Sequence, residues 1–263
     1  MGASEPQFLD VGAGGRRRRI AYLAAPQIRP DGPGIVWLIG LKSDMASTKA
    51  VALAEWTAAR GIGFTRFDYS GHGRSDGRFE DATIGDWLEE AEAVFETLTA
   101  GPQVLVGSST GGHVALILLQ KLLRERPEAA ARVKGLVLIA PAWDLTEELM
   151  WKQFSPQAKR DLMEKGVYHQ PSEYGEPYAI TRKFIEDGRK HLIAPEPFDP
   201  GRPVVVLQGL LDQAVPAAHA RRLAEVLKGG HVEITEVHDG EHRLSRPEDL
   251  EKLYGLIERV LAS

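Results

Sequence analysis

The stretch of residues 103–112 constrains the fold more than any other part of the chain. It reads Gln-Val-Leu-Val-Gly-Ser-Ser-Thr-Gly-Gly, and an apolar segment over residues 113–123 follows it. This order predicts a buried strand, a tight turn and a buried helix, with Ser109 at the centre of a Gly-x-Ser-x-Gly pattern. Side chains at the two flanking glycines would collide with the strand and the helix, so we expect the serine to be pushed out where a substrate can reach it.

The size and composition fit one large domain. The chain has 263 residues, of which 43% are hydrophobic and 26% charged, and a chain of this length buries roughly 70–75% of its unfolded surface. It contains no cysteine, which excludes disulfides, thiolate catalysis and cysteine-ligated metals. No apolar run is long enough to cross a bilayer, and the net charge of −5 argues against nucleic acid as a partner. Oligomeric state is not readable from the sequence.

The beginning of the chain carries no recognisable targeting signal. Met-Gly-Ala-Ser-Glu-Pro lacks the basic and long apolar regions of a secretory signal, and Pro6 stands where a myristoylation motif requires Ser or Thr. These features predict a cytoplasmic protein. The one basic cluster, residues 16–19, runs directly into Ile-Ala-Tyr-Leu, so we expect it to belong to a charged edge strand and not to a phosphate-binding arm.

Apolar runs and helical patterns alternate along the chain, as they do in an α/β fold with a mostly parallel central sheet flanked by helices. Strands are expected at residues 8–11, 18–23, 35–39, 63–68, 103–107, 134–140, 203–208 and 231–238, and helices at 47–60, 84–98, 113–123, after Pro216 and at the C-terminus. Thr83 is expected to cap the second helix and Gly61 to end the first. Ser245 and Glu248 have the spacing of a capping box for the last one.

Residues 143–198 interrupt this alternation. They contain no evident strand and an excess of aromatic, methionine, proline and charged residues. One helix is expected to begin at Ser155-Pro156 and end at Gly166, and another to cover residues 178–191. We predict a small helical lid inserted in a core formed by residues 1–142 and 199–263. Its aromatic residues either line a substrate pocket or hold the lid on the core: Trp143, Trp151, Phe154, Tyr168, Tyr174, Tyr178 and Phe184.

A serine hydroxyl becomes a good nucleophile only when a base takes its proton, and imidazole, with a free pKa of about 6.5, suits that task near neutral pH. The histidine in turn needs a carboxylate that fixes its tautomer. After a nucleophile of this type the expected chain order is serine, acid, histidine, with the last two on loops at the carboxyl ends of late strands. Ser109, Asp212 and His242 meet these conditions and are the predicted catalytic residues.

Other residues compete for the acid and base roles. His238 belongs to the end of the last predicted strand and not to the loop, while Asp239 and Glu241 are rival acids. The Gly-x-x-Asp-x-x-Val-Pro turn favours Asp212 over both. A metal site built from His238, Glu241 and His242 is conceivable but lacks a recognised zinc spacing, so no metal is predicted.

An oxyanion hole needs two backbone amides. The N–H of Thr110 opens the predicted helix after the nucleophile, where the helix dipole is positive. The second amide normally comes from the loop after the strand that here ends at Gly40, so Leu41 is the candidate. His72, in the turn after the strand at residues 63–68, and His113, just after the nucleophile, are expected to lie beside the pocket and are candidates to line it.

Several motifs together resemble the serine hydrolases of the α/β-hydrolase superfamily, over nearly the whole chain. They are the Gly40-Leu-Lys-Ser-Asp-Met45 loop with Thr48-Lys49-Ala50, the Arg66-Phe-Asp-Tyr-Ser-Gly71 turn, the Val106-Gly-Ser-Ser-Thr-Gly-Gly112 elbow and Lys165-Gly-Val167. The chain is similar to a narrower group that contains mycophenolic acid acyl-glucuronide esterase and palmitoyl-protein thioesterase. The chain departs from the pattern of these proteins in two ways. It lacks a mitochondrial transit segment, which favours a bacterial cytoplasmic relative, and it has Ile39 where many members of the superfamily carry histidine.

The resemblance implies an α/β-hydrolase fold and hydrolysis of a small acyl ester or thioester by Ser109, Asp212 and His242. The residues predict the same chemistry, acyl transfer through an acyl-enzyme, and it requires no cofactor. Two alternatives stay open. The same triad could cleave a carbon–carbon bond or use an acceptor other than water, and a binding protein could carry an inert triad on this fold.

Overall fold

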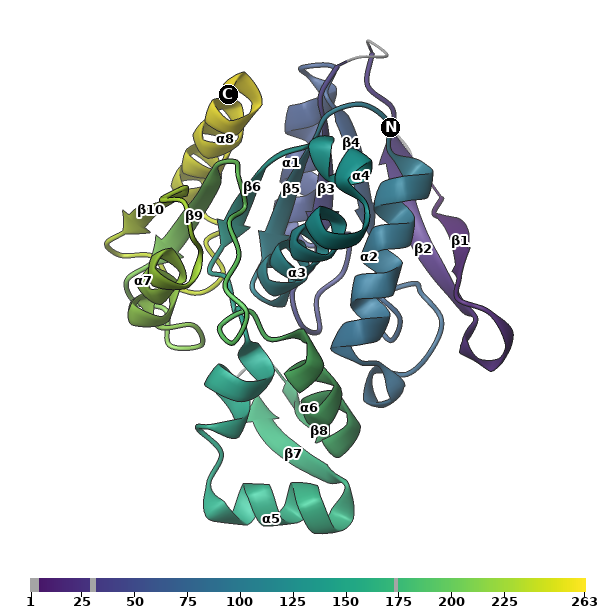
Figure 1. Ribbon diagram of the computed structural model, residues 1–263, viewed down its shortest axis with the longest axis vertical. Coiled ribbons are helices and arrows are strands. Elements are labelled where there is room, and N and C mark those ends of the chain that lie inside the picture. The colour runs from purple at the N-terminus through teal and green to yellow at the C-terminus, as the bar shows by residue number, and fades with distance from the viewer. Residues whose placement is uncertain (1–4, 29–31, 173–174) are drawn as a thin grey trace.

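The computed structural model describes residues 5–28, 32–172 and 175–263, and Figure 1 shows a central sheet between layers of helices. In the described part of the chain the main sheet has eight strands in the order β1-β2-β4-β3-β5-β6-β9-β10. Their bounds are β1 (Gln7–Val11), β2 (Arg18–Ala25), β3 (Gly34–Leu38), β4 (Gly63–Phe67), β5 (Gln103–Ser108), β6 (Val133–Ile139), β9 (Val204–Gly209) and β10 (Val232–Val237). β2 is antiparallel to both β1 and β4, and the remaining pairs are parallel, which confirms the predicted sheet.

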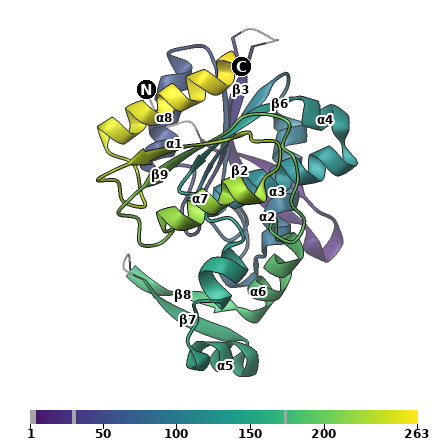
Figure 2. The ribbon, with the colours of Figure 1, turned by 60° about the vertical axis from the view of Figure 1, so that its left-hand side comes forward.

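Helices cover both faces of this sheet. They are α1 (Thr48–Ala58), α2 (Ile84–Leu98), α3 (Thr110–Glu125), α4 (Pro127–Ala131), α7 (Ala217–Val226) and α8 (Pro247–Ala262), with short 3-10 turns at Gly14–Arg16 and Phe79–Asp81. The turned view in Figure 2 shows α1 and α8 on one face and α2 and α3 on the other. Tyr174 and the first four residues, on which part of the sequence analysis relied, lie outside the described residues.

The core lies where the sequence is most continuously apolar. Every residue of β3 and β5 is buried, and α3 is buried nearly all round, as its sequence predicts. A Cβ on Gly111 would overlap the carbonyl groups of Leu38 and Ile39. Glycine at that position therefore lets the start of α3 pack directly on the end of β3.

The predicted helix boundaries hold in most places. The Thr83 hydroxyl accepts the Asp86 N–H at 3.1 Å, and Gly61 has a φ of +67° after α1. The capping box of α8 is an exception. Arg246, and not Ser245, caps this helix, and its N–H donates to Asp249 Oδ2 at 3.1 Å. The Pro at position 247 shifts the start of the helix, because proline is favoured at its first position.

The basic cluster does not form an edge strand as predicted. β2 lies between β1 and β4, so β1 is the edge. The Arg18 side chain is only 13% exposed and donates at 2.6 Å to both Glu89 and Glu90 of α2. The ion pairs of this arginine thus join the hairpin formed by β1 and β2 to α2.

The segment between β6 and β9, residues 143–198, is called here the inserted segment. It holds a π-helical turn (η3, Thr146–Trp151), α5 (Pro156–Lys165), β7 (Val167–Ser172), β8 (Gly175–Thr181), α6 (Arg182–Gly188) and a 3-10 turn (η4, Arg189–His191). In Figure 1 it lies below the sheet. α5 confirms the first predicted helix, whereas residues 178–181 of the second belong to β8. β7 and β8 form an antiparallel pair, so the prediction that the segment contains no strand is wrong. Pro171 and Pro177 lie in these strands, and proline disfavours helix both at its own position and at the preceding one.

Asp144 joins the two ends of the inserted segment. Its carboxylate accepts the N–H groups of Ile193 at 2.7 Å and Ala194 at 2.9 Å. The Trp143 ring beside it stacks on His219 with the ring centroids 4.4 Å apart, and Phe184 packs on Trp87 at 5.4 Å. These two aromatic residues hold the inserted segment to the core and are buried.

Candidate active site

Ser109 lies at the sharp turn between β5 and α3. Its backbone has φ +54° and ψ −116°, a conformation that residues with a Cβ rarely adopt. The turn is fixed from the neighbouring strand end, because the Ser109 N–H donates to Ile139 O at 2.8 Å and Ser109 O accepts the Ala142 N–H at 3.0 Å. A Cβ on Gly107 would overlap the Gly111 backbone. The two glycines of the motif thus permit the tight turn that the sequence predicts.

Asp212 and His242 meet at the carboxyl ends of β9 and β10. His242 Nδ1 lies 2.8 Å from Asp212 Oδ2. The other carboxylate oxygen of Asp212 accepts the N–H groups of Ala214 at 2.9 Å and Val215 at 2.8 Å. The Asp212 side chain is fully buried and that of His242 is 24% exposed. Backbone amides therefore hold Oδ1 of Asp212, while Oδ2, which also accepts the Gln208 side-chain amide at 3.4 Å, orients the imidazole.

The two loops that carry this pair are packed against each other. A Cβ on Gly209 would overlap Gly240 O, and the Leu211 N–H donates to the same carbonyl at 2.9 Å. On the far side of His242, the Lys49 ammonium of α1 donates to Arg243 O. Burial, together with the positive charge of Arg243, lowers the pKa of Lys49 to about 8. Contacts from both sides thus fix the histidine loop.

The rival residues are less suited to these roles. His238 is exposed, and Asp239 is held by Arg246, whose guanidinium lies 2.6 Å from its carboxylate. Within the described part of the chain, the Ser109 hydroxyl makes no hydrogen bond to His242. The structure therefore joins the predicted acid to the predicted base.

The two residues predicted to supply the oxyanion-hole amides belong to segments next to Ser109. Thr110 is the first residue of α3, and a Cβ on Gly40 would lie 3.4 Å from Ser109 Cβ, which puts the loop that begins with Leu41 beside the nucleophile. Among the backbone hydrogen bonds of the described residues, none uses the N–H of Leu41 or of Thr110. Neither donor therefore has a backbone acceptor in the described part of the chain.

The loop after β3 is held by residues whose role the sequence analysis did not identify. Asp68, at the end of β4, accepts the Met45 N–H at 2.6 Å and the Arg74 N–H at 2.8 Å, and the Arg66 guanidinium donates to Met45 O at 2.8 Å. The signal available in the sequence was the glycine-rich turn after Asp68. A Cβ on Gly73, at φ +47°, would overlap the Asp68 carboxylate.

His72 and His113 are both buried, so neither lines an open pocket. His72 Nε2 accepts the Lys42 N–H at 3.1 Å, and burial lowers the pKa of His72 to about 4. His113 Nδ1 accepts the Asp144 N–H at 3.2 Å, and burial lowers the pKa of His113 to about 3. Both are neutral acceptors for backbone amides. His113 supports the base of the inserted segment.

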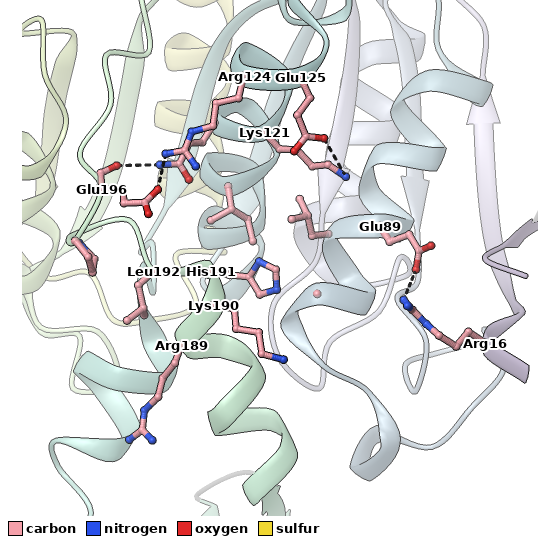
Figure 3. Close-up of a pocket in the computed structure, with 15 residues that line it drawn as sticks. Arg16, Glu89, Lys121, Arg124, Glu125, Arg189, Lys190, His191, Leu192 and Glu196 are labelled. Atoms are coloured by element: carbon pink, nitrogen blue, oxygen red, sulfur yellow. Dashed lines mark hydrogen bonds and ion pairs between the residues drawn. The ribbon is translucent and has the colours of Figure 1, made fainter.

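A separate polar hollow of about 440 Å³ lies among α2, α3 and η4 (Figure 3). It contains none of the predicted catalytic residues. Its five cationic side chains all have a carboxylate partner within 3.5 Å: Arg16 with Glu89, Lys121 with Glu92, Arg124 with Glu196, Arg189 with Glu147 and Lys190 with Asp187. Because these charges are already compensated, the hollow is not a strong anion site.

The fold has close counterparts among solved structures. A putative hydrolase from Agrobacterium vitis S4 is 41% identical, with a TM-score of 0.94 over 98% of each chain. The mouse alpha/beta hydrolase domain-containing protein 10 is 29% identical, with a TM-score of 0.84 over 98% of this chain and 99% of that one.

A curated relative corrects the prediction of location. Human palmitoyl-protein thioesterase ABHD10, mitochondrial, is 32% identical over 247 residues, which are 93% of this chain and 78% of the relative. The bovine protein of the same name is 31% identical over 251 residues. Because these relatives are mitochondrial, the prediction of a cytoplasmic protein is overturned. Among the described residues, no helix has the length and apolarity needed to span a bilayer.

A family model also matches the region that holds the elbow. Residues 36–183 match the model described as Serine aminopeptidase, S33 (Hydrolase_4), which covers more than half of the chain. The matched range runs from β3, before the Leu41 loop, through Ser109 and into the inserted segment. The eight-stranded sheet, the serine elbow, the solved structures and this match agree, and the chain belongs to the Hydrolase_4 (S33) family of α/β-hydrolases.

Proposed function

We propose that the protein hydrolyses carboxylic esters or acyl thioesters through Ser109, His242 and Asp212. The observation that carries the proposal is the 2.8 Å hydrogen bond between His242 Nδ1 and Asp212 Oδ2, at the same sheet edge as the strained turn at Ser109. A carboxylate can only accept, so this contact assigns the proton of the neutral imidazole to Nδ1. Nε2 then keeps the lone pair that a general base needs.

The reaction follows from these positions. Nε2 of His242 takes the hydroxyl proton of Ser109 as Oγ attacks the carbonyl carbon, and Asp212 stabilises the imidazolium that forms. The negative charge that develops on the carbonyl oxygen accepts hydrogen bonds from the amides of Leu41 and Thr110. The imidazolium then protonates the leaving alcohol or thiol. Water, activated by the same nitrogen, releases the acid from the acyl-enzyme.

Water as acceptor and an acyl thioester as substrate class are supported by the relatives named palmitoyl-protein thioesterase. The chemistry of both substrate classes is the same at the carbonyl carbon, and only the leaving group differs. A thiolate is the better leaving group, so the demand on His242 as a general acid is smaller for a thioester than for an alkyl ester.

We further infer that residues 143–198 act as a lid over this edge of a core formed by residues 1–142 and 199–263. The Lys42 ammonium, one residue from the proposed oxyanion donor Leu41, lies 6.0 Å from the Tyr178 ring of β8. The inserted segment therefore approaches the oxyanion loop directly. Tyr178→Ala should change the preferred acyl chain length and leave the pH dependence unchanged, whereas an identical chain-length profile would remove this role.

A panel of p-nitrophenyl esters and acyl thioesters of rising chain length tests the function. The wild type should hydrolyse members of both series, and Ser109→Ala should lose about 10⁶-fold in kcat, the scale seen when a serine nucleophile is removed. Exposed His238 offers a matched control, since His238→Ala should keep most of the activity. Turnover of bulky aryl ketones alone would replace the proposal with carbon–carbon hydrolysis, and an unchanged rate in Ser109→Ala would reject the triad.

A further inference from the structure

We propose that His72 is a positioning residue for the oxyanion hole, because its imidazole holds the Lys42 amide and thereby orients the adjoining Leu41 N–H toward the reacting carbonyl. This inference rests on the proposed function. His72 lies on the loop after β4 and touches neither Ser109 nor His242 in the contacts of the described residues. It acts only through the backbone of the neighbouring loop.

The two ring nitrogens of His72 have different, fixed partners. Nδ1 lies 3.2 Å from Ser70 O, which can only accept, and Nε2 lies 3.1 Å from the Lys42 nitrogen, which can only donate. The proton is therefore on Nδ1, and Nε2 is the acceptor. One tautomer satisfies both contacts, and no other protonation state of the ring does.

The ring is also held from its sides. Its centroid lies 5.1 Å from that of Trp87, 5.6 Å from Phe79 and 6.0 Å from Tyr69, each in an edge-to-face arrangement. The Trp87 indole N–H donates to Ser70 O at 3.2 Å, the same carbonyl that His72 contacts. An imidazole packed this way has little freedom to move, so it can fix the position of the Lys42 N–H that it accepts.

The loop that bears Ser70 is in turn fixed to the helix layer. The Ser70 N–H donates at 2.9 Å to Glu90 of α2, and Arg18 of β2 donates at 2.6 Å to the other oxygen of this carboxylate. Glu90 is fully buried. A continuous set of hydrogen bonds thus runs from the core of the protein through Ser70 and His72 to Lys42.

The Lys42 backbone needs such a support. Its φ is +57°, an uncommon conformation for a residue with a Cβ. The peptide group that carries the Lys42 N–H shares the Leu41 Cα with the group that carries the Leu41 N–H. Without the His72 acceptor, the Lys42 amide is left unpaired and the loop can rotate into a conformation that turns Leu41 N–H away from Ser109.

Two substitutions of similar size separate this role from simple packing. In His72→Gln the side-chain oxygen can reach the place of Nε2 and accept the Lys42 N–H. In His72→Asn the shorter amide reaches only the place of Nδ1, so the Lys42 amide loses its acceptor. Removing one oxyanion donor costs about 10²–10³ in kcat, and we expect a loss of about 10–100-fold for His72→Asn through misorientation, with KM within about threefold of wild type. His72→Gln should stay within about threefold in kcat.

The experiment measures kcat and KM for one p-nitrophenyl ester and the inhibition constant of a trifluoromethyl ketone, whose adduct with serine carries an oxyanion. Under the proposal, His72→Asn weakens the inhibitor by the same factor as it lowers kcat/KM, and His72→Gln restores both. Equal values for the two variants, whether both impaired or both normal, would overturn the role of His72. Ser109→Ala is measured in parallel, and its full activity would instead reject the proposed function.

Discussion

Ser109→Gly should stabilise the protein while it abolishes activity. The backbone of Ser109, at φ +54° and ψ −116°, is strained for any residue with a Cβ. Such a conformation costs about 1–3 kcal/mol. Glycine adopts it freely, although its greater freedom in the unfolded chain subtracts about 0.4–1 kcal/mol from the gain. The expected net effect is an increase of about 1 kcal/mol in the free energy of unfolding.

Ser109→Ala is the matched control. It removes the same hydroxyl, which makes no hydrogen bond to His242 in the described residues, but it keeps the Cβ and with it the strain. Its stability should therefore lie close to that of the wild type. For a chain of this size a change of 1 kcal/mol corresponds to about 2–4 °C in Tm. Ser109→Gly should accordingly unfold about 2–4 °C above Ser109→Ala.

Urea unfolding of the three proteins, followed by tryptophan fluorescence with a thermal scan as a second probe, measures the difference. The urea dependence of the unfolding free energy should be the same for all three, because the surface exposed on unfolding does not change. A Ser109→Gly variant no more stable than Ser109→Ala would refute the reasoning. It would mean that the surroundings, and not the backbone of this residue, absorb the cost of the turn.

Three further outcomes follow from the same contacts. Asp212→Asn should lower kcat by about 10³–10⁴ with little change in KM, because an amide at this position lets the imidazole of His242 carry its proton on Nε2, the nitrogen that has to act as the base. In steady-state assays His242→Ala should abolish turnover, and equal losses in His238→Ala would undo the choice of base. Asp144→Ala leaves two backbone amides at the far end of the inserted segment without their acceptor, so the free energy of unfolding, measured in urea, should fall by about 2–5 kcal/mol. A decrease below about 0.5 kcal/mol would show that Asp144 does not join the two ends of the segment. Burial lowers the pKa of His113 to about 3, so below about pH 6.5, the pKa in the unfolded chain, the unfolded chain binds a proton that the folded chain does not. The free energy of unfolding should therefore fall by about 2 kcal/mol between pH 7 and 5 on account of this residue, whose stabilising contribution is complete only above about pH 6.5. A His113→Gln variant whose free energy of unfolding falls as steeply with pH would refute this.

The parts of the fold that were predictable are those in which local and global preferences agree. The elbow around Ser109 is an example, because a buried strand, two glycines and a buried helix each demand the same turn. Asp212 and His242 follow from chain order and from their places in loops after late strands, since the carboxyl ends of parallel strands meet at one edge. The two residues do lie at hydrogen-bond distance. Their part in catalysis is the proposal that the experiments test.

The strand pair of the inserted segment was not predictable in the same way. β7 and β8 pair only with each other in the described residues, so neither shows the apolar run of a core strand, and the prolines at 171 and 177 were the one local sign against helix. The contacts of Asp68 and His72 with the oxyanion loop were hidden for a different reason. They join residues more than 20 positions apart through side chains whose types are common in any turn.

The central claim is that Ser109 is the nucleophile activated by His242, and covalent labelling with a fluorophosphonate tests it most directly. Intact-mass measurement of the wild type should reveal the addition of one probe, and peptide mapping should locate it on Ser109. Ser109→Ala should gain no mass, and His242→Ala should react at least about 10³-fold more slowly. Labelling of Ser109→Ala at the wild-type rate, or a probe found on another residue of the wild type, would contradict the account.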